Sequence, residues 1–214
     1  MQKVSHFNCA LTQQVYFIAH EFYSQYNTFV KKIFIAFFAF ALFSAANAAD
    51  NVFFDDADEN SLSIYVAQST GSGSLLHLIY PGIWEIVPMT SIMVQYSQPM
   101  TIFRFPSRMN FNLIQNIAYN SADGLSFFGG GISWDIAPIS WHGIYAGIGV
   151  GPYYRDNHDR WVSSRLVFGE KFFIGARIAE RTRVEFFTLH FSNGDFTETN
   201  LGFNFAGLSI GYSF

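Results

Sequence analysis

Hydrophobic and polar residues alternate with a period of two along most of the chain after residue 60. In the stretch "SLSIYV", Leu62, Ile64 and Val66 fall on one face of an extended chain. In "MNFNLIQNIAY", hydrophobic residues such as Phe111 occupy one face and asparagines such as Asn112 occupy the other. Successive side chains of a β-strand point to opposite faces. The pattern therefore predicts strands with one apolar and one polar face, as in barrels that cross a membrane.

Eight segments of this kind follow one another, separated by turn-forming residues. Segments of about 10 residues suit strands that cross a bilayer at a tilt. Eight strands close a barrel that is narrow enough for side chains to fill. The sequence therefore predicts an all-β fold, an eight-stranded antiparallel up-and-down transmembrane β-barrel. Glu170 interrupts the apolar face of the sixth segment. The eight segments are "SLSIYV", "SIMVQY", "MNFNLIQNIAY", "GLSFFGGGISW", "SWHGIYAGIGV", "SRLVFGEKFFIGARI", "RVEFFTLHFS" and "NFAGLSIGYSF".

The composition argues against a soluble domain, a helical membrane protein and a nucleic-acid-binding protein. Of the 214 residues, 50% are hydrophobic, 19% aromatic and only 13% charged, which is too apolar for an ordinary soluble domain. Yet no run after residue 50 reaches the roughly 18 consecutive apolar residues of a membrane-spanning helix. Residues 49–214 carry nine basic and fifteen acidic side chains, so no basic surface for a nucleic acid is expected.

One strongly apolar run, "IFIAFFAFALF", lies near the N-terminus. Lys31 and Lys32 precede it and small residues follow it, and this order of basic, apolar and small residues describes a secretory signal peptide. We predict a signal peptide at residues 30–48, cleaved after Ala48, and a β-barrel at residues 49–214. Residues 1–29 are polar and without pattern, and we interpret them as a leader that results from a misassigned translation start.

The last segment alternates up to an aromatic C-terminal residue, with Leu208, Ile210, Tyr212 and Phe214 on one face. This ending resembles the C-terminal signature of bacterial outer-membrane barrels, which the barrel assembly machinery recognises. The resemblance implies a place among the lipids of the Gram-negative outer membrane. With the N-terminus in the periplasm, the connection between the last two segments lies at the cell surface.

No cofactor or metal is expected. The only cysteine, Cys9, precedes the predicted cleavage site, so the mature chain has no thiolate ligand. The glycine runs "FFGGG" and "GIGVG" are not followed by a helical pattern, which a nucleotide-binding glycine loop requires. We interpret these glycines as positions inside a densely packed barrel where there is no room for a larger side chain.

The stretch "TLHFSNGD" places reactive side chains on the seventh segment. His190 and Ser192 share one face of the strand with the apolar Val184 and Phe186. Asn204 shares the outward face of the eighth segment. We therefore expect all three polar residues on the lipid-facing outer wall, near the cell-surface rim. An imidazole can take the proton of a hydroxyl that attacks an acyl group, provided that a third group orients the ring.

These residues resemble those of a known family, the lipid A deacylases of the PagL type. The similarity is sharpest from about Val167 to Phe214, in "FGEKFFIGARI", "HFSN", an N-x-G-x-N motif that ends at Asn204, and "LSIGYSF". Members of the family are eight-stranded outer-membrane barrels with a Ser/His/Glu site on the lipid-facing wall, and they remove the 3-O-linked acyl chain of lipid A. The resemblance implies a carboxylic ester hydrolase that acts on lipopolysaccharide without a cofactor.

Carried over residue by residue, the resemblance makes His190 the general base and Ser192 the nucleophile. It makes Asn193 and Gly194 the oxyanion stabilisers, through amide donors directed at the developing charge. The third position departs from the family, because Asn204 stands where the best-known members have a glutamate. An amide can still accept a bond from a ring N–H, although it stabilises an imidazolium less well than a carboxylate does. From sequence alone, a glutamate at position 204 is expected to preserve or raise the rate.

Three alternatives stay open at this point. Glu198, in the connection between the last two segments, would orient His190 if Asn204 does not. A non-catalytic eight-stranded barrel for adhesion or envelope structure is the rival function, and in it Ser192 is replaceable. A homodimer is the alternative to a single barrel.

Overall fold

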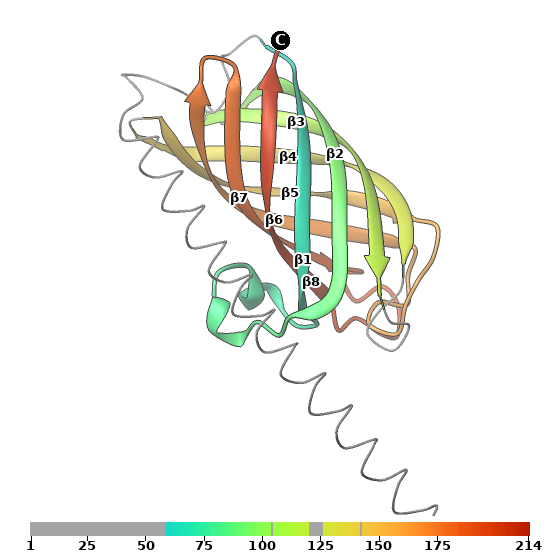
Figure 1. Cartoon of the computed structure of the whole chain (residues 1–214). Coiled ribbons are helices and arrows are strands. Elements are labelled where there is room, and N and C mark those ends of the chain that lie inside the picture. The colour runs from blue at the N-terminus through green and yellow to red at the C-terminus, as the bar shows by residue number, and fades with distance from the viewer. Residues whose placement is uncertain (1–58, 104, 120–125, 142) are drawn as a thin grey trace, which may run out of the picture. The chain divides into compact units, whose positions relative to one another are not determined.

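Eight antiparallel strands close into a barrel in the computed structural model of the protein (Figure 1). The structure describes residues 59–103, 105–119, 126–141 and 143–214, and the predicted leader and signal peptide lie outside the described residues. Each strand pairs with the next and β8 pairs with β1, which confirms the predicted barrel. The strands are β1 (Ser61–Gly71), β2 (Val87–Ile102), β3 (Phe105–Ala118), β4 (Phe127–Trp141), β5 (Ile144–Arg155), β6 (Leu166–Ala179), β7 (Thr182–Ser192) and β8 (Phe203–Ser213), and two short 3-10 helices, η1 (Leu75–Leu78) and η2 (Pro81–Ile83), lie between β1 and β2.

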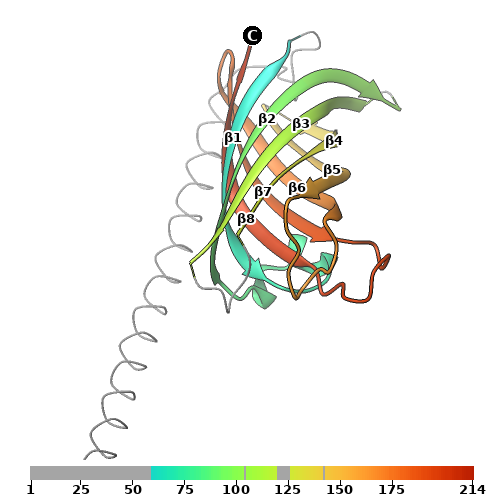
Figure 2. The same cartoon turned by 90° about the vertical axis from the view of Figure 1, so that its right-hand side faces the viewer.

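The two ends of the barrel differ in the length of their connections (Figures 1 and 2). Tight turns join β2 to β3, β4 to β5 and β6 to β7 at the end where the C-terminus lies. The connections at the other end are longer and span residues 72–86, 119–126, 156–165 and 193–202. Short turns are typical of the periplasmic side of outer-membrane barrels and long loops of the cell surface. The connection between β7 and β8 is therefore at the cell-surface end.

The alternation in the sequence produces an apolar outer wall and a filled interior. Outward side chains such as Leu113 and Ile148 are more than half exposed, as expected for a wall that contacts lipid. None of the helices in the described residues is long and apolar enough to cross a bilayer. Inside the barrel, a Cβ on Gly149 would overlap the carboxylate of Asp135. The glycine runs thus lie where the interior leaves no room for a larger side chain, as predicted.

Charged side chains fill the middle of the barrel and neutralise one another. Arg108 Nε lies 2.8 Å from Asp135 Oδ2, and Arg108 Nη1 lies 3.0 Å from Glu185 Oε1. Lys171 Nζ lies 2.6 Å from the same Asp135 oxygen. The Tyr65 hydroxyl donates to Glu185 Oε2 at 2.9 Å. Burying a charge costs several kcal/mol unless it is paired and hydrogen-bonded, so this network lets charged groups close the lumen without a large penalty.

Replacing Glu185 with alanine is expected to destabilise the barrel strongly. The change removes a carboxylate from Arg108 and the acceptor of the Tyr65 and Tyr145 hydroxyls. Removing one partner of a buried ion pair costs about 3–5 kcal/mol. Urea unfolding in detergent measures the loss, and Glu180→Ala, at an exposed position after β6, is the control. Equal midpoints for the two variants would show that the network contributes nothing to stability.

A layer of aromatic side chains fills the barrel behind β7 and β8 near the cell-surface end. The ring of Phe203 lies 5.1 Å from that of Phe191 and 5.8 Å from that of Phe205, measured between centroids. The guanidinium carbon of Arg155 lies 5.2 Å from the Phe203 ring centre. Such close-packed rings hold their strands rigidly, and the outward residues of this part of the wall are therefore well positioned.

Candidate active site

His190 and Asn204 face each other on the outside of the barrel, across β7 and β8. They are register partners, and their neighbours Phe191 and Phe203 belong to the aromatic layer inside. Nδ1 of the His190 imidazole lies 2.7 Å from Oδ1 of Asn204, a hydrogen-bond distance. The structure thus brings together two of the three residues that the sequence analysis assigned to the catalytic group.

Two backbone carbonyl groups decide which end of the Asn204 amide faces the imidazole. Nδ2 of Asn204 donates to the carbonyl oxygens of Gly71, at 3.2 Å, and Gly73, at 3.3 Å. Only the NH₂ group of an amide can donate, so Oδ1 faces His190 and the ring carries its proton on Nδ1. In the neutral ring Nε2 is then free to accept a proton. The amide therefore selects the tautomer that a general base needs.

Ser192 follows two residues after His190 on the same face of β7 and is half-buried. Its side chain interacts with the carboxyl group of Glu170, which is the β6 residue paired with His190. Within the part of the chain that the structure describes, no hydrogen bond joins Ser192 to His190. Catalytic hydrogen bonds of this kind are often long without substrate and tighten when substrate binds, so the arrangement is compatible with a nucleophile and its base.

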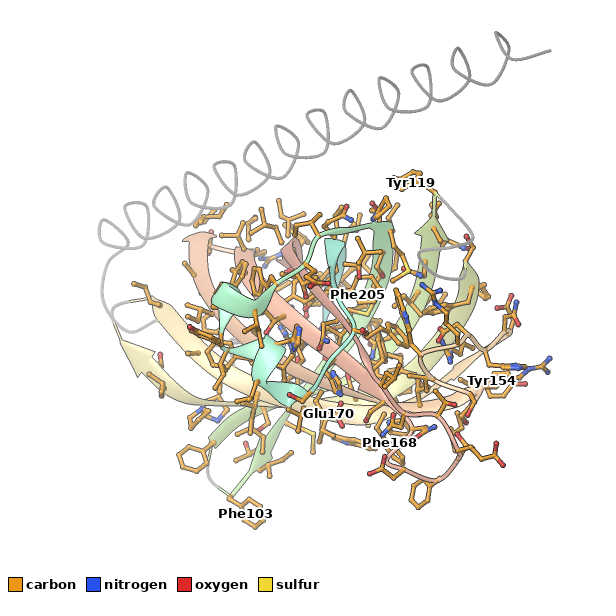
Figure 3. The ribbon with its side chains drawn as sticks, turned by 90° about the horizontal axis from the view of Figure 1, so that it is seen from below. Phe103, Tyr119, Tyr154, Phe168, Glu170 and Phe205 are labelled. Atoms are coloured by element: carbon orange, nitrogen blue, oxygen red, sulfur yellow. The ribbon has the colours of Figure 1, made fainter. Side chains whose placement is uncertain are left out.

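Glu170 lies beside the candidate site, a position that the sequence alone does not predict. It lies on the outward face of β6, two residues after Phe168, which points to the same face. Both residues are labelled in Figure 3, which views the molecule from below. Its Oε2 atom is buried and has no hydrogen-bond partner among the described residues. A buried polar atom without a partner is costly and rare.

The connection between β1 and β2, residues 72–86, folds back over the outer wall, and we call it the strap (Figure 1). Its first helix, η1, contacts β7 and also touches β6 and β8. The hydroxyl of Thr188, an outward residue of β7, donates to the carbonyl oxygen of Leu78 at 2.7 Å. The strap is therefore fixed on the lipid-facing side of the wall, beside the residues of the site.

The strap changes the exposure expected for the site. From sequence, His190 and Asn204 are expected to face lipid directly. Their outward direction is right, but the expected exposure is wrong, because they are 5% and 1% exposed. The strap covers them, since Gly73 contacts Asn204 and the imidazole of His77 is close enough to His190 to interact electrostatically with it. Ser192, farther toward the rim, stays accessible.

The donors of Asn193, one of the two predicted oxyanion residues, are occupied within the connection between β7 and β8. The backbone N–H donates to Asn200 Oδ1 at 2.9 Å. The side-chain Nδ2 donates to the Thr199 carbonyl at 2.9 Å and to the Thr197 hydroxyl. Gly194 is exposed and has a φ of 62°, a left-handed conformation that suits glycine. Asn193 thus holds the turn together, and Gly194 is the more accessible of the pair.

Glu198, the alternative partner of His190, is exposed in the same connection. The acceptor at Nδ1 of His190 is Asn204 instead. Across the described ranges, no group of three or more His, Cys, Asp or Glu side chains is arranged to hold a metal ion.

Comparisons with known proteins place this chain in a family. The family model of lipid A 3-O-deacylase (PagL) matches residues 90–213. Among solved structures, the outer membrane enzyme PagL is 13% identical, with a TM-score of 0.47 over 71% of this chain and 98% of that one. Neisserial surface protein A is 10% identical, with a TM-score of 0.48 over 72% and 97%. Ail of Yersinia pestis is 11% identical, with a TM-score of 0.42 over 73% and 99%. No curated protein sequence matches the chain.

The likeness to the solved structures is distant and concerns the fold alone. The family match has more weight, because it covers more than half of the chain and includes β6, β7 and β8. Those strands carry Glu170, His190, Ser192 and Asn204. The protein therefore belongs to the lipid A 3-O-deacylase (PagL) family and resides in the Gram-negative outer membrane.

Proposed function

We propose that the protein hydrolyses the 3-O-linked acyl ester of lipid A, with Ser192 as nucleophile and His190 as general base. Family membership supports lipid A as the substrate. The observation that carries the mechanism is the 2.7 Å hydrogen bond between His190 and Asn204, because it leaves Nε2 of the imidazole as the proton acceptor on the side of the ring away from Asn204.

The first half of the reaction transfers the acyl group to the protein. His190 Nε2 takes the proton of the Ser192 hydroxyl while the hydroxyl oxygen attacks the ester carbonyl carbon. The tetrahedral intermediate collapses when the bond to the sugar oxygen breaks, and His190 gives its proton to that oxygen. The products are the deacylated sugar hydroxyl and an acyl ester on Ser192.

The second half restores the free protein. A water molecule gives a proton to His190 as its oxygen attacks the acyl-serine ester, and the imidazolium then returns the proton to Ser192. A free fatty acid leaves. Both halves require a donor for the negative oxygen of the intermediate, and the Gly194 backbone N–H is the better candidate, since Asn193 serves the turn.

Glu170 brings to the site the carboxyl group that Asn204 lacks. Its carboxyl group interacts with the Ser192 side chain, and it lies opposite His190 in the strand pairing. A carboxylate next to a forming imidazolium lowers the energy of the charged state. We therefore assign the orienting role to Asn204 and the charge-stabilising role to Glu170.

Glu170→Gln is expected to slow ester hydrolysis while leaving the barrel intact. The substitution keeps the shape but removes the charge, and a loss of roughly 10- to 100-fold corresponds to one charge interaction of about 1.4–2.7 kcal/mol. Hydrolysis of p-nitrophenyl esters in detergent gives the rate, and Glu85→Gln, an exposed strap residue, is the control. An unchanged rate in Glu170→Gln would remove Glu170 from the mechanism.

Mass spectrometry of lipid A tests the function as a whole. Cells that make the protein are expected to contain lipid A that lacks one hydroxyacyl chain, and cells that make the Ser192→Ala variant are expected to keep it. Fragmentation of the product identifies the position that was cleaved. An unchanged lipid A profile with correctly assembled protein would favour the rival function, a non-catalytic barrel.

A further inference from the structure

Gly202 lies between the two asparagines of the N-x-G-x-N motif and directly precedes β8. It is buried and has a φ of 66°, a left-handed conformation that favours glycine. The conformation alone is one reason for a glycine at this position. The surroundings add a second and independent reason, because they leave no room for a side chain.

The imidazole of His190 fills the space beside Gly202. A Cβ atom at position 202 would overlap Cε1 of the ring and would lie 3.1 Å from Nε2. It would also lie 2.7 Å from the carbonyl oxygen of Gly73 in the strap. Cε1 is the ring atom between the two nitrogens, and Nδ1 is bonded to Asn204. Asn204 therefore holds one atom of the ring, and the backbone of Gly202 bounds the edge next to it.

The backbone on both sides of this contact is anchored. Leu201 N–H donates to the Trp161 carbonyl at 2.7 Å, and the ring of Phe203 belongs to the aromatic layer inside the barrel. In the strap, Gly73 N–H donates to the Leu201 carbonyl at 3.0 Å. Neither Gly202 nor Gly73 can therefore move aside without breaking these interactions.

The imidazole is the part of the contact that moves most easily. Among the described residues it makes one hydrogen bond, to Asn204, and a side chain can rotate while the backbone stays in place. We propose that Gly202 is a positioning residue, because the space left by its missing side chain holds the His190 ring with Nδ1 on Asn204 and Nε2 free. The effect on the rate rests on the proposed function, whereas the position of the ring does not.

Gly202→Ala is expected to lower kcat for p-nitrophenyl myristate by roughly 10²-fold, because a misplacement of about 1 Å at a catalytic group has an effect of this size. KM is expected to stay at the wild-type value, since Gly202 is buried. Gly143→Ala is the control for backbone strain, because Gly143 has a φ of 80° in the turn between β4 and β5 at the opposite end of the barrel. It is expected to keep the wild-type kcat. Equal kcat values for the two variants, or a loss confined to KM, would overturn the proposal.

The tautomer of His190 tests the position of the ring without any hydrolysis. Imidazole nitrogen chemical shifts of histidine-labelled protein in detergent distinguish a ring protonated on Nδ1 from one protonated on Nε2, and the signals that disappear in His190→Gln identify this residue. Wild type is expected to show the Nδ1-protonated form. Gly202→Ala is expected to show a mixture of both forms, since the ring loses Asn204, and this result supports the proposal even if no fatty acid is ever released. The Nδ1-protonated form alone in both proteins would overturn it.

A protein without the imidazole shows whether the ring is what an added side chain meets. In the His190→Ala background, Gly202→Ala keeps the left-handed strain but no longer overlaps the ring. The urea midpoint in detergent is therefore expected to fall less in this background than in wild type. If Gly202→Ala alone does not assemble, the double variant is expected to assemble, as read from heat-modifiable gel mobility. Equal falls in the two backgrounds, or a double variant that fails to assemble as well, would contradict the assignment of Gly202.

Discussion

Ser192→Ala is expected to abolish fatty-acid release while the barrel still assembles. The serine oxygen forms the acyl-enzyme, and no neighbouring side chain replaces it, so the rate is expected to fall by at least about a thousandfold. The side chain is on the outside of the wall and fills no interior space. Purified protein assayed with p-nitrophenyl myristate gives the rate, and heat-modifiable gel mobility reports assembly.

His190→Gln is expected to cause a similar loss, and the double variant is expected to be no worse than either single variant. Residues that act as one catalytic unit fail together, so their effects do not add. Two unrelated rim residues would instead show small and additive effects. A Ser192→Ala protein that still releases fatty acid would remove the nucleophile from the mechanism and favour the non-catalytic barrel.

The fold was predictable because the bilayer leaves a strand few choices. Most outward side chains from β1 to β8 have to be apolar to contact lipid, and backbone groups have to bond within the closed sheet. Alternation therefore locates the strands, and counting residues along β7 and β8 places His190 and Asn204 outward. Their hydrogen bond needs only parity and adjacency of the two strands, both of which the sequence carries.

The sequence pattern shows Glu170 as a break in the apolar face of β6, but it predicts neither the place of Glu170 beside His190 nor the strap, for different physical reasons. Glu170 meets His190 through the register between β6 and β7, which depends on hydrogen bonds and turn geometry and not on the period of two. The strap has no regular period. Its position depends on single tertiary bonds, such as that from Thr188 to the Leu78 carbonyl. Without Glu170 and the strap, the predicted site is more exposed and has fewer residues than the site in the structure.

Asn204→Ala is expected to reduce the rate by roughly 10²- to 10⁴-fold, because His190 loses the acceptor that fixes its tautomer. Glu198→Gln, which changes an exposed residue in the same part of the barrel, is the control and is expected to leave the rate unchanged. The reverse result, a silent Asn204→Ala and a damaging Glu198→Gln, would assign the orienting role to Glu198.

Asn204→Asp is expected to lower the rate as well, although it introduces the type of group that the family uses at this position. The change replaces the NH₂ group with an oxygen at the place where the Gly71 and Gly73 carbonyls now accept hydrogen bonds at 3.2 and 3.3 Å. Two hydrogen bonds of about 0.5–1.5 kcal/mol each are lost, and oxygen–oxygen repulsion is added. We expect a loss of roughly 10- to 100-fold for this reason.

The contact with the strap favours an amide over a carboxylate at position 204. A second experiment on Asn204→Asp therefore measures whether the strap detaches from the wall. Repulsion from the carboxylate pushes the Gly73 carbonyl, and with it the strap, away from the wall, so chymotrypsin is expected to cleave the strap near Leu76 and Tyr80 faster than in wild type. Glu198→Gln protein is expected to be cleaved at the wild-type rate.

The same reasoning applies to Asn204→Glu, whose longer side chain brings a carboxylate against the same carbonyls. It reverses the expectation drawn from sequence alone. A faster Asn204→Asp or Asn204→Glu enzyme with an intact strap would show that the site tolerates the carboxylate and that the amide is not required by its neighbours.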